Sequence, residues 1–480
     1  MLDINLFRED KGFNPEVVRE SQRKRGASVE VVDEIIDLDN EWKKARFNAN
    51  ETNKKINGIN KQIATLMKQK KKDETKDLVS EKANLQKEKE LLENIAAEKE
   101  KILNSKLMTV GNLVHKSVPV SMDEKDNVIV MKHWPEGRNE DSEKLRRCKL
   151  IKADGKGVDG LMSHHELLEK IGGYDSARGA NVAGHRGYFL TGPGVDLNLA
   201  IIRYGLDFLE KKDYLKIYTP FFMRKEVMAK TAQLEEFDEA LYKVEGGGDN
   251  DKYLIATSEQ PISAYHAGEW FANPETDLPK KYAGQSTCFR KEAGKHGHDT
   301  WGIFRVHQFE KIEQFVLTDT EKSWDMHEEM LNIAKEFNES LGLPYQVVAI
   351  VSGALNNAAA KKYDLECWFP FQGEYKELVS CSNCTDYQSR RLDIRVGPKK
   401  LNDSTKKFAH ALNCTLAATG RTICCILENY QTEKGVKIPE VLVPYMNGKT
   451  FLPFVADRKR SGSAKKAEKD VADAVNHIKI

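Results

Sequence analysis

The sequence predicts an α+β protein in which an antiparallel hairpin of two long helices precedes a largely antiparallel β-sheet. Two observations predict this class. Apolar residues recur at steps of four and three through the first hundred residues. Strand-like and helix-like segments then follow without the regular strand–helix alternation of a parallel sheet. The 480 residues can form two or three domains, and we expect them at 1–117, 118–456 and 457–480.

Residues 29–68 predict one long helix with a single apolar seam. The seam residues are Val31, Ile35, Leu38, Trp42, Ala45, Ala49, Thr52, Ile56, Ile59, Ile63 and Leu66. A polar break at residues 70–75 precedes a second seam. Its residues are Leu78, Leu85, Leu92, Ile95 and Ile102. Two helical runs joined by a short connection are expected to lie antiparallel as a hairpin.

The net charge of +1 hides an uneven distribution. Residues 41–75 hold ten Lys/Arg and four Asp/Glu, a local +6, and residues 456–480 hold seven and four, a local +3. The lysines of the first helix and its tip are Lys43, Lys44, Lys54, Lys55, Lys61, Lys68, Lys70, Lys71 and Lys72. Their excess favours a phosphate backbone as the partner, and a solvated coiled-coil face is the alternative. Because aromatic residues are scarce in the helical hairpin, the hairpin is expected to recognise the shape of an RNA rather than its base sequence.

Composition excludes several classes of protein. The mean hydropathy is −0.59, and no apolar run approaches the ~18 residues of a membrane span. The acidic start near Glu9 and Asp10 resembles neither a secretory signal nor a transit peptide, so we expect a cytoplasmic protein. Cys381 and Cys384 lack a second pair, which favours buried thiols over zinc. A P-loop and a Gly-x-Gly-x-x-Gly helix start are also absent, so a nucleotide would bind by another route.

The body after residue 141 shows the patterns of separate strands and helices. Residues 286–292, 301–317 and 345–351 predict strands. Residues 319–341 and 421–428 predict helices.

Three segments concentrate polar residues within apolar surroundings. Around residues 288–313, alternation places one set on a common strand face: Arg305, His307, Phe309, Lys311 and Glu313. Arg suits a phosphate, Phe a stacked ring and Glu an ammonium. Residues 364–391 contain oxygen donors suited to Mg²⁺, namely Asp364, Glu366, Glu377, Ser380, Asn383 and Asp386. Residues 410–431 contain Asn413, Thr415 and Arg421.

These segments resemble the class II aminoacyl-tRNA synthetases. Phe-Arg-Lys-Glu at 289–292 and Arg-Val-His-Gln-Phe-Glu-Lys-Ile-Glu at 305–313 resemble motif 2. Residues 415–428, with Gly-Arg-Thr at 420–422, resemble motif 3, and residues 214–223, with Pro220, resemble the dimer-interface motif 1. Thr-Ser-Glu at 257–259, Asn-Cys-Thr at 413–415 and the basic hairpin narrow the resemblance to seryl-tRNA synthetases. Residues 235–244 and the basic tail are similar to the eukaryotic cytosolic branch.

The resemblance implies an enzyme that attaches L-serine to tRNA(Ser), and also to tRNA(Sec), through a seryl-adenylate. It implies ATP as substrate, Mg²⁺ as cofactor, a homodimer without membrane attachment, and tRNA(Ser) bound by the N-terminal coiled coil. The implied catalytic residues are Arg290 at the α-phosphate and Arg421, which with Phe309 would sandwich the adenine ring. Glu292 would accept a hydrogen bond from the adenine amino group.

The site residues carried over from the family are as follows. ATP would bind to Arg290, Lys291, Glu292, Val306, His307, Gln308, Phe309, Glu377, Leu378, Val379, Ser380 and Arg421. Serine would bind to Thr257, Ser258, Glu259, Arg290, Glu313, Asn413 and Thr415. Mg²⁺ would bind to Glu377 and Ser380.

The sequence departs from the family pattern in motif 3, where Cys414, Leu416 and Thr419 replace smaller residues. Two alternatives are a synthetase-like RNA-binding protein without catalysis and a class II synthetase for another amino acid. The complete ATP motifs disfavour the first, and the coiled coil together with Asn413–Thr415 disfavours the second. For the tail around residues 458–466, a solvated or tRNA-contacting segment is favoured over a nuclear localisation signal.

Overall fold

The computed structural model describes residues 1–71, 73–143, 160–231, 240–247, 250–292, 300–398 and 406–455. The predicted tail 457–480, the lysine at position 72 and residues 293–299, between the two halves of motif 2, lie outside these residues. Backbone contacts divide the chain into two compact units. The smaller unit comprises Met1–Lys116, Val120–Met122 and Ser352–Ala358, and the larger unit comprises Ser117–Pro119, Asp123–Val351 and Ala359–Ile480.

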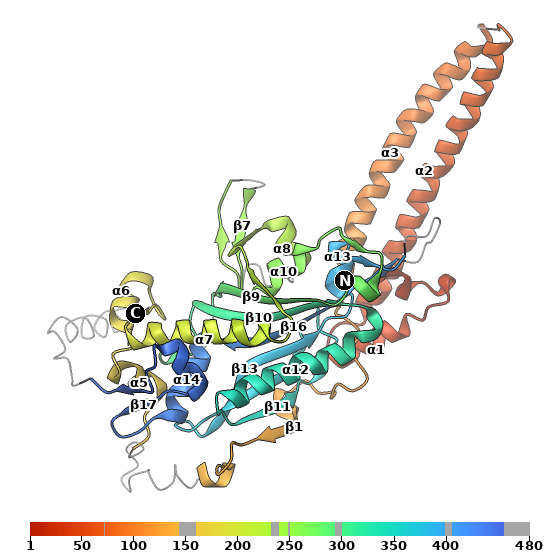
Figure 1. Ribbon diagram of the computed structural model, residues 1–480. Helices are drawn as coiled ribbons and strands as arrows, with labels where there is room; N and C mark the ends of the chain where they lie inside the picture. Colours follow the sequence, from red (N-terminus) through yellow and green to blue (C-terminus); the bar gives the residue numbers. More distant parts are fainter. Residues whose placement is uncertain are drawn as a thin grey trace, which may run out of the picture. The chain divides into compact units, whose positions relative to one another are not determined.

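The smaller unit is built around the predicted helical hairpin. Figure 1 shows α2 and α3 running antiparallel, side by side. The unit's elements are η1 (Ile4–Phe7), η2 (Glu9–Lys11), α1 (Glu16–Arg25), α2 (Glu30–Lys68), η3 (Asp73–Thr75), α3 (Lys76–Leu107) and η8 (Ser352–Ala354). The ion pairs Lys99–Glu41, at 2.7 Å, and Lys106–Glu34 join the two helices. The hairpin prediction is therefore confirmed.

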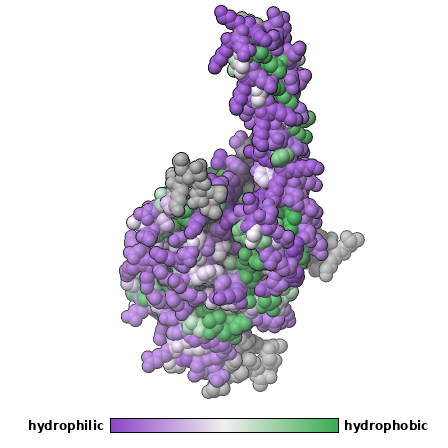
Figure 2. Space-filling model, turned by 90° about the vertical axis from the view of Figure 1, so that its right-hand side faces the viewer, coloured by the Kyte–Doolittle hydropathy of each residue, from purple (hydrophilic) through white to green (hydrophobic). Residues whose placement is uncertain are grey.

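The seam of α2 follows the prediction, but the seam of α3 differs from it. Every predicted apolar position on α2 is buried or half-buried. On α3, Ile95 and Ile102 are 37% and 49% exposed, whereas Ala96 and Leu103 are 1% and 4% exposed. The sequence-based choice was wrong by one residue at both positions, because each has an apolar neighbour that the periodicity alone does not exclude. Figure 2 shows that the remaining hairpin surface is mainly hydrophilic.

The larger unit contains an eight-stranded sheet in the order β1-β11-β12-β13-β16-β10-β9-β4. Its strands are β1 (Val128–His133), β11 (Tyr345–Ala349), β12 (Lys361–Phe369), β13 (Glu374–Asn383), β16 (His410–Ala418), β10 (Gln308–Thr318), β9 (Lys280–Phe289) and β4 (Leu215–Tyr218). Every pairing in this sheet is antiparallel except that of β4 with β9. The predicted α+β class is thereby confirmed.

Helices cover both faces of this sheet. The main core joins three helices to one face: α7 (Pro193–Glu210), α12 (Ser323–Ser340) and α14 (Thr419–Tyr430). A second apolar cluster joins residues of α10 (Glu259–Tyr265) and α13 (Tyr387–Leu392) to Phe315 and Leu317 of β10. Since side chains alternate along a strand, Lys311 and Glu313 share the face of Phe315 and Leu317.

Short elements complete the larger unit. The helices are η4 (Glu124–Asp126), α5 (His164–Lys170), α6 (Ser176–Ala183), α8 (Lys225–Thr231), α11 (Pro274–Asp277), η7 (Thr320–Lys322) and η9 (Glu440–Met446). The strands are β2 (Tyr174–Asp175), β3 (Phe189–Leu190), β5 (Phe222–Arg224), β6 (Lys243–Val244), β7 (Lys252–Leu254), β8 (Trp270–Phe271), β14 (Arg395–Val396), β15 (Lys407–Phe408), β17 (Gly435–Lys437) and β18 (Phe451–Pro453).

One predicted strand begins later than expected. The strand predicted from residue 301 starts at Gln308, and residues 301–307 form turns and bends. Arg305 and His307 therefore do not belong to the strand face predicted for them. The strand predicted for 286–292 ends at Phe289.

Two further expectations concern membranes and cysteines. None of the described helices combines the length and apolar character needed to cross a bilayer. The seven cysteines in the described part of the chain are free and buried, as expected for reduced thiols.

Candidate active site

Two β-bulges gather the polar residues of the predicted site on one face of the sheet. In the pairing of β12 with β13, Leu365 lies opposite Val379 and Glu366 opposite Glu377, so Leu378 is the extra residue. Leu378 and Val379 both belong to the main core. Glu377 and Ser380 therefore face the other side together, although residues three apart on a regular strand face opposite sides.

The second bulge has the same effect on β16. Glu313 pairs with Thr415 and Ile312 with Ala417, so Leu416 is the extra residue, and both Leu416 and Ala417 enter the main core. Thr415 consequently faces the same side as Glu313. The bulky residues noted in motif 3, Cys414 and Leu416, fill the core beneath the site.

The residues predicted to bind serine form a compact polar cluster on this face. Lys311 Nζ lies 2.5 Å from Glu313 Oε2, and both side chains are almost fully buried. Thr415 Oγ1 donates to the same Glu313 oxygen at 3.3 Å. Gln388 Nε2 donates to Glu259 Oε1 at 2.8 Å. Burial, followed by the charge of Glu313, raises the pKa of Glu259 to about 7.

The other predicted serine residues differ in their accessibility. Asn413 is 8% exposed, and its Nδ2 donates to Cys384 Sγ at 3.6 Å. Thr257 Oγ1 accepts from the Glu259 amide at 3.2 Å. Ser258 is fully buried against Gly284, where a Cβ would lie 2.9 Å from its Oγ. The Ser258 hydroxyl thus lies in the protein core rather than on the polar face.

Both predicted catalytic arginines act on Glu377. Arg421 Nη1 lies 3.2 Å from Glu377 Oε2 and donates to the Glu377 carbonyl at 2.8 Å. The Glu377 side chain is 46% exposed; partial desolvation alone would raise its pKa, but Arg421 and then Arg290 outweigh it and lower the pKa. The Arg290 guanidinium lies 5.2 Å from the Phe309 ring centroid, and that of Arg421 lies 4.8 Å from the Phe304 ring centroid. Arg290 rather than Arg421 thus stacks on Phe309 in this structure.

The remaining predicted ATP residues lie at the end of β9, at the start of β10 and on β13. Glu292, at a positive φ of 48°, pairs with Arg305 at 2.9 Å. His307 Nδ1 lies 3.1 Å from the Arg290 carbonyl and 3.0 Å from the Tyr242 hydroxyl. The backbone of Lys291 donates to the Ala240 carbonyl, and the Gln308 carbonyl accepts from Tyr188. Val306, Leu378 and Val379 are buried, so only their backbones could contact a nucleotide.

Oxygen donors suited to a divalent cation surround Ser380. Asp364 pairs with Ser380 across the two strands, and its Oδ1 is buried without a hydrogen-bond partner. Burial and the charge of Glu377 raise the pKa of Asp364. No cluster of three Asp, Glu, His or Cys side chains with metal-site geometry occurs within the described ranges. Glu377, Ser380 and the orphaned Asp364 oxygen nevertheless form a hard-oxygen set that fits Mg²⁺.

Three neighbours of the site were not among the predicted binding residues: Lys311, Gln388 and Phe304. The alternation of the sequence placed Lys311 on the same strand face as Glu313, but Lys311 was assigned no binding role. Gln388 and Phe304 reach the site from α13 and from the turn before β10, and no local pattern in the sequence marks them.

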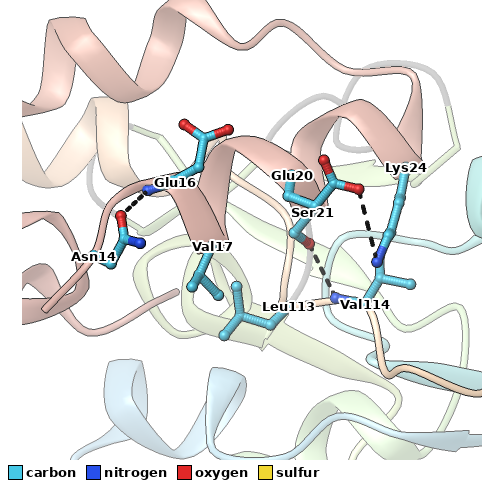
Figure 3. A pocket seen from close by; sticks show the side chains of 8 residues that line it. All are labelled: Asn14, Glu16, Val17, Glu20, Ser21, Lys24, Leu113 and Val114. Atoms are coloured by element: carbon cyan, nitrogen blue, oxygen red, sulfur yellow. Dashed lines mark hydrogen bonds and ion pairs between the residues drawn. The ribbon is translucent and has the colours of Figure 1, made fainter.

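A separate pocket lies within the smaller unit. It has a volume of about 310 Å³ and is lined by Asn14, Glu16, Val17, Glu20, Ser21, Lys24, Leu113 and Val114. Figure 3 shows Val17 and Leu113 pointing toward each other and the Ser21 hydroxyl bonded to the Val114 amide, at 3.0 Å. None of the predicted site residues lines this pocket.

Comparison with known proteins agrees with this arrangement. Residues 1–114 match the seryl-tRNA synthetase N-terminal domain, and residues 242–430 match the tRNA synthetase class II core domain (G, H, P, S and T). The cytoplasmic serine–tRNA ligase of Schizosaccharomyces pombe is 58% identical over 98% of this chain and 100% of its own length. The Homo sapiens protein of the same name is 48% identical over 95% of this chain and 91% of its own.

Two crystal structures share the fold along most of the chain. Cytoplasmic serine–tRNA ligase from Naegleria fowleri, in complex with AMP, has a TM-score of 0.80 at 49% identity and covers 95% of this chain and 99% of that one. Seryl-tRNA synthetase from Pyrococcus horikoshii, complexed with ATP, has a TM-score of 0.81 at 40% identity and covers 95% and 100%. The helical hairpin, the antiparallel sheet with its polar face and these near-full-length matches show that the chain belongs to the seryl-tRNA synthetase family.

Proposed function

We propose that this protein is a serine–tRNA ligase that uses ATP to form seryl-adenylate and then transfers the seryl group to tRNA(Ser). One observation carries the proposal. Arg290 and Arg421 both act on Glu377, Arg290 lies over the Phe309 ring, and the carboxylates of Glu259 and Glu313 interact, in a family whose relatives are named serine–tRNA ligases. The relatives' names also support a cytoplasmic location.

The first step needs positioning and charge neutralisation more than proton transfer. The serine carboxylate is already a nucleophile and attacks the α-phosphorus of ATP while pyrophosphate leaves. Arg290 is placed to neutralise charge that develops on the α-phosphate, a role worth about 3–4 kcal/mol for one preorganised donor. Glu377 and Ser380 would hold Mg²⁺, with Asp364 beside them. When bound, the ion neutralises and orients the phosphates.

The serine side of the site is selected by charge and by hydrogen bonds. Glu259 and Glu313 are the carboxylates for the substrate ammonium. Asn413 and Thr415 lie on the neighbouring strand, where their polar groups would meet the hydroxyl. A site that hydrogen-bonds a hydroxyl can reject an analogue without it by about 10⁴-fold, since its own groups would be left unpaired. L-Alanine should therefore be a very poor substrate.

The test is pyrophosphate–ATP exchange without tRNA. The purified protein should exchange pyrophosphate only when L-serine and Mg²⁺ are present, and Arg290→Ala should lower kcat at least 100-fold. A folded protein that shows no serine-dependent exchange would refute the proposal. Exchange supported by another amino acid would instead indicate a different synthetase specificity.

We further propose that the protein acts as a homodimer through the motif 1 region. β4 is an edge strand of the sheet, and Leu215 and Tyr218 on it are 63% and 70% exposed. Val195 and Leu199, one turn apart on α7, and Phe222 on β5 are also exposed. Exposed apolar side chains on neighbouring elements are typical of a protein–protein interface. A mass of one chain in light scattering at micromolar concentration would contradict this assignment.

Binding of tRNA is proposed for the hairpin of α2 and α3. The lysines on α2 are largely solvent-exposed, so their charges are available to a phosphate backbone. Attachment of serine to tRNA(Sec) stays a prediction from the family resemblance.

A further inference from the structure

The glutamates proposed to bind the substrate ammonium already have a buried cation beside them. Lys311 Nζ contacts Glu313 Oε2 at 2.5 Å, with side-chain exposures of 8% and 2%. Thr415 Oγ1 donates to the same oxygen. Two donors therefore converge on a single oxygen of Glu313 and fix the orientation of its carboxylate.

The carboxylates of this cluster outnumber the ammonium groups that touch them. Glu259 receives a hydrogen bond from the neutral Gln388, and no described cation forms an ion pair with it within 4.0 Å. The charge of Glu313 acts on Glu259 and disfavours its ionised form, whereas Lys311 and, at longer range, Lys362 favour it. The cluster thus holds two carboxylates and one contacting ammonium. A second ammonium would balance the charges.

Stability alone does not explain a lysine at this position. A buried ion pair often contributes little to folding, because desolvation offsets the attraction between the charges. Without the lysine, the two neighbouring carboxylates, of which Glu313 is buried and Glu259 half-buried, would hold a shared proton more tightly. A substrate ammonium would then have to displace that proton.

We propose that Lys311 is a positioning residue for serine recognition: its ammonium fixes Glu313 and neutralises one carboxylate, so that the ammonium of the amino acid meets weaker competition from a proton at the second carboxylate. This inference rests on the proposed function, in which Glu259 and Glu313 bind serine. In this proposal Lys311 controls the charge state of Glu259 and Glu313 and does not itself contact the substrate.

The proposal predicts a shift in the pH dependence of serine use. With Lys311 present, burial and Glu313 raise the pKa of Glu259 to about 7, so kcat/KM for serine should fall as the pH drops below about 7. The fall in kcat/KM on the acidic side of the profile is called the acid limb. In Lys311→Met the acid limb should move to higher pH, because a cation that favours the ionised form of Glu259 is lost. Each pH unit of movement lowers kcat/KM about tenfold at a fixed pH on the limb. KM for ATP should not change.

Several other titratable groups act on the two carboxylates and have to be considered in the profile. They are Lys362 of β12 and Cys384 after β13, which act on Glu259, and Cys288 of β9 and Cys414 of β16, which act on Glu313. Burial raises the pKa of all three thiols, so they stay neutral through the range tested.

The experiment measures serine-dependent pyrophosphate exchange from pH 5.5 to 9 for the wild type, Lys311→Met and Lys311→Arg. Lys281→Met is the matched control, because Lys281, on β9 of the same sheet, forms a 2.7 Å ion pair with Glu329 of α12 and none with either carboxylate. We expect the limb to move in Lys311→Met, to return toward the wild-type position in Lys311→Arg, and to stay in place in Lys281→Met. A limb that coincides in wild type and Lys311→Met would overturn the inference, as would an equal rise in KM for ATP and for serine.

A second measurement reports on the protons directly. Calorimetry of L-serine binding to the wild-type protein at pH 6.5, in buffers of different ionisation enthalpy, should show proton release. If Lys311→Met does not fold, Lys311→Gln takes its place, because its amide can still donate to Glu313 without carrying a charge, and it should show the same shift of the pH profile. No proton release in the wild type, or an unchanged profile in a folded Lys311→Gln variant, would also contradict the inference. Absence of any serine-dependent exchange or heat in the wild type would instead refute the proposed function itself.

Discussion

At the scale of single residues, a buried histidine–glutamate pair joins distant parts of the catalytic fold. His164 and Glu428 are 1% and 0% exposed, and His164 Nδ1 lies 2.9 Å from Glu428 Oε1. The other Glu428 oxygen accepts from the Phe371 amide at 3.0 Å, and His164 Nε2 lies 3.1 Å from the Trp301 carbonyl. The pair connects α5, α14 and the turn that carries Phe304, the ring on which Arg421 lies.

Removal of Glu428 should therefore destabilise the larger unit strongly. Glu428→Ala leaves the buried His164 ring and the Phe371 amide without their acceptor, and a buried polar group left unsatisfied typically costs about 1–3 kcal/mol. Glu433→Ala, at an exposed glutamate nearby, should change stability by about 0.5 kcal/mol or less. Urea denaturation of both variants measures the difference. Similar midpoints for the two would show that the pair does not contribute to stability.

At the scale of elements, the two helices of the hairpin differ in how well sequence defines their seam. On α2 adjacent apolar pairs occur near the two ends, but from Ala45 to Ile59 the seam residues have no apolar neighbour in the sequence and leave one choice at each step. On α3 adjacent apolar pairs, Ile95–Ala96 and Ile102–Leu103, offer two choices that differ by 100° around the helix. The partner helix decides between them, and it selects Ala96 and Leu103.

This choice can be tested with neighbouring substitutions. Leu103→Ala should cost about 2–4 kcal/mol, because it leaves a cavity in the seam. Ile102→Ala, at an exposed position, should cost about 0.5 kcal/mol or less. Thermal unfolding followed by circular dichroism compares the two. A larger loss of stability in Ile102→Ala than in Leu103→Ala would show that Ile102, as expected from the sequence, belongs to the seam.

At the scale of the whole molecule, charge and chemistry are divided between the two units. The net charge of +1 combines a local +6 on residues 41–75 with a net negative remainder. The predicted ATP and serine residues lie in the larger unit, and the basic hairpin lies in the smaller one. Adenylate formation and tRNA binding should therefore be separable.

Deletion of residues 30–105 should leave serine-dependent pyrophosphate exchange nearly intact while abolishing the charging of tRNA. The reason is that the hairpin contributes no residue to the predicted ATP or serine sites. Parallel exchange and aminoacylation assays on the same preparation measure both activities. Equal loss of exchange and charging would mean that the hairpin is required by the catalytic fold.

Replacement of Lys68, Lys70, Lys71 and Lys72 by Ala should weaken tRNA binding and flatten its dependence on salt. Each lost phosphate contact lowers the slope of log K against log[salt] by about 0.7–0.9. Binding titrations between 50 and 300 mM KCl measure the slope. An unchanged slope would mean that these lysines do not contact phosphates and form only a solvated face of the coiled coil.

The sequence by itself determined the hairpin, the α+β class and the chemical types of the site residues, because periodicity and short motifs are local properties. It did not determine which residues of different strands share a face, or where bulges change the alternation within a strand. Residues 377 and 380 would face opposite sides of a regular strand, and only the bulge at Leu378, set by pairing with β12, brings them together. The hydrogen bond from Thr415 to Glu313, and the burial of Ser258 under Gly284, likewise depend on neighbouring strands and on α10. Tertiary structure decided these features because strand register and packing join residues that are far apart in the chain.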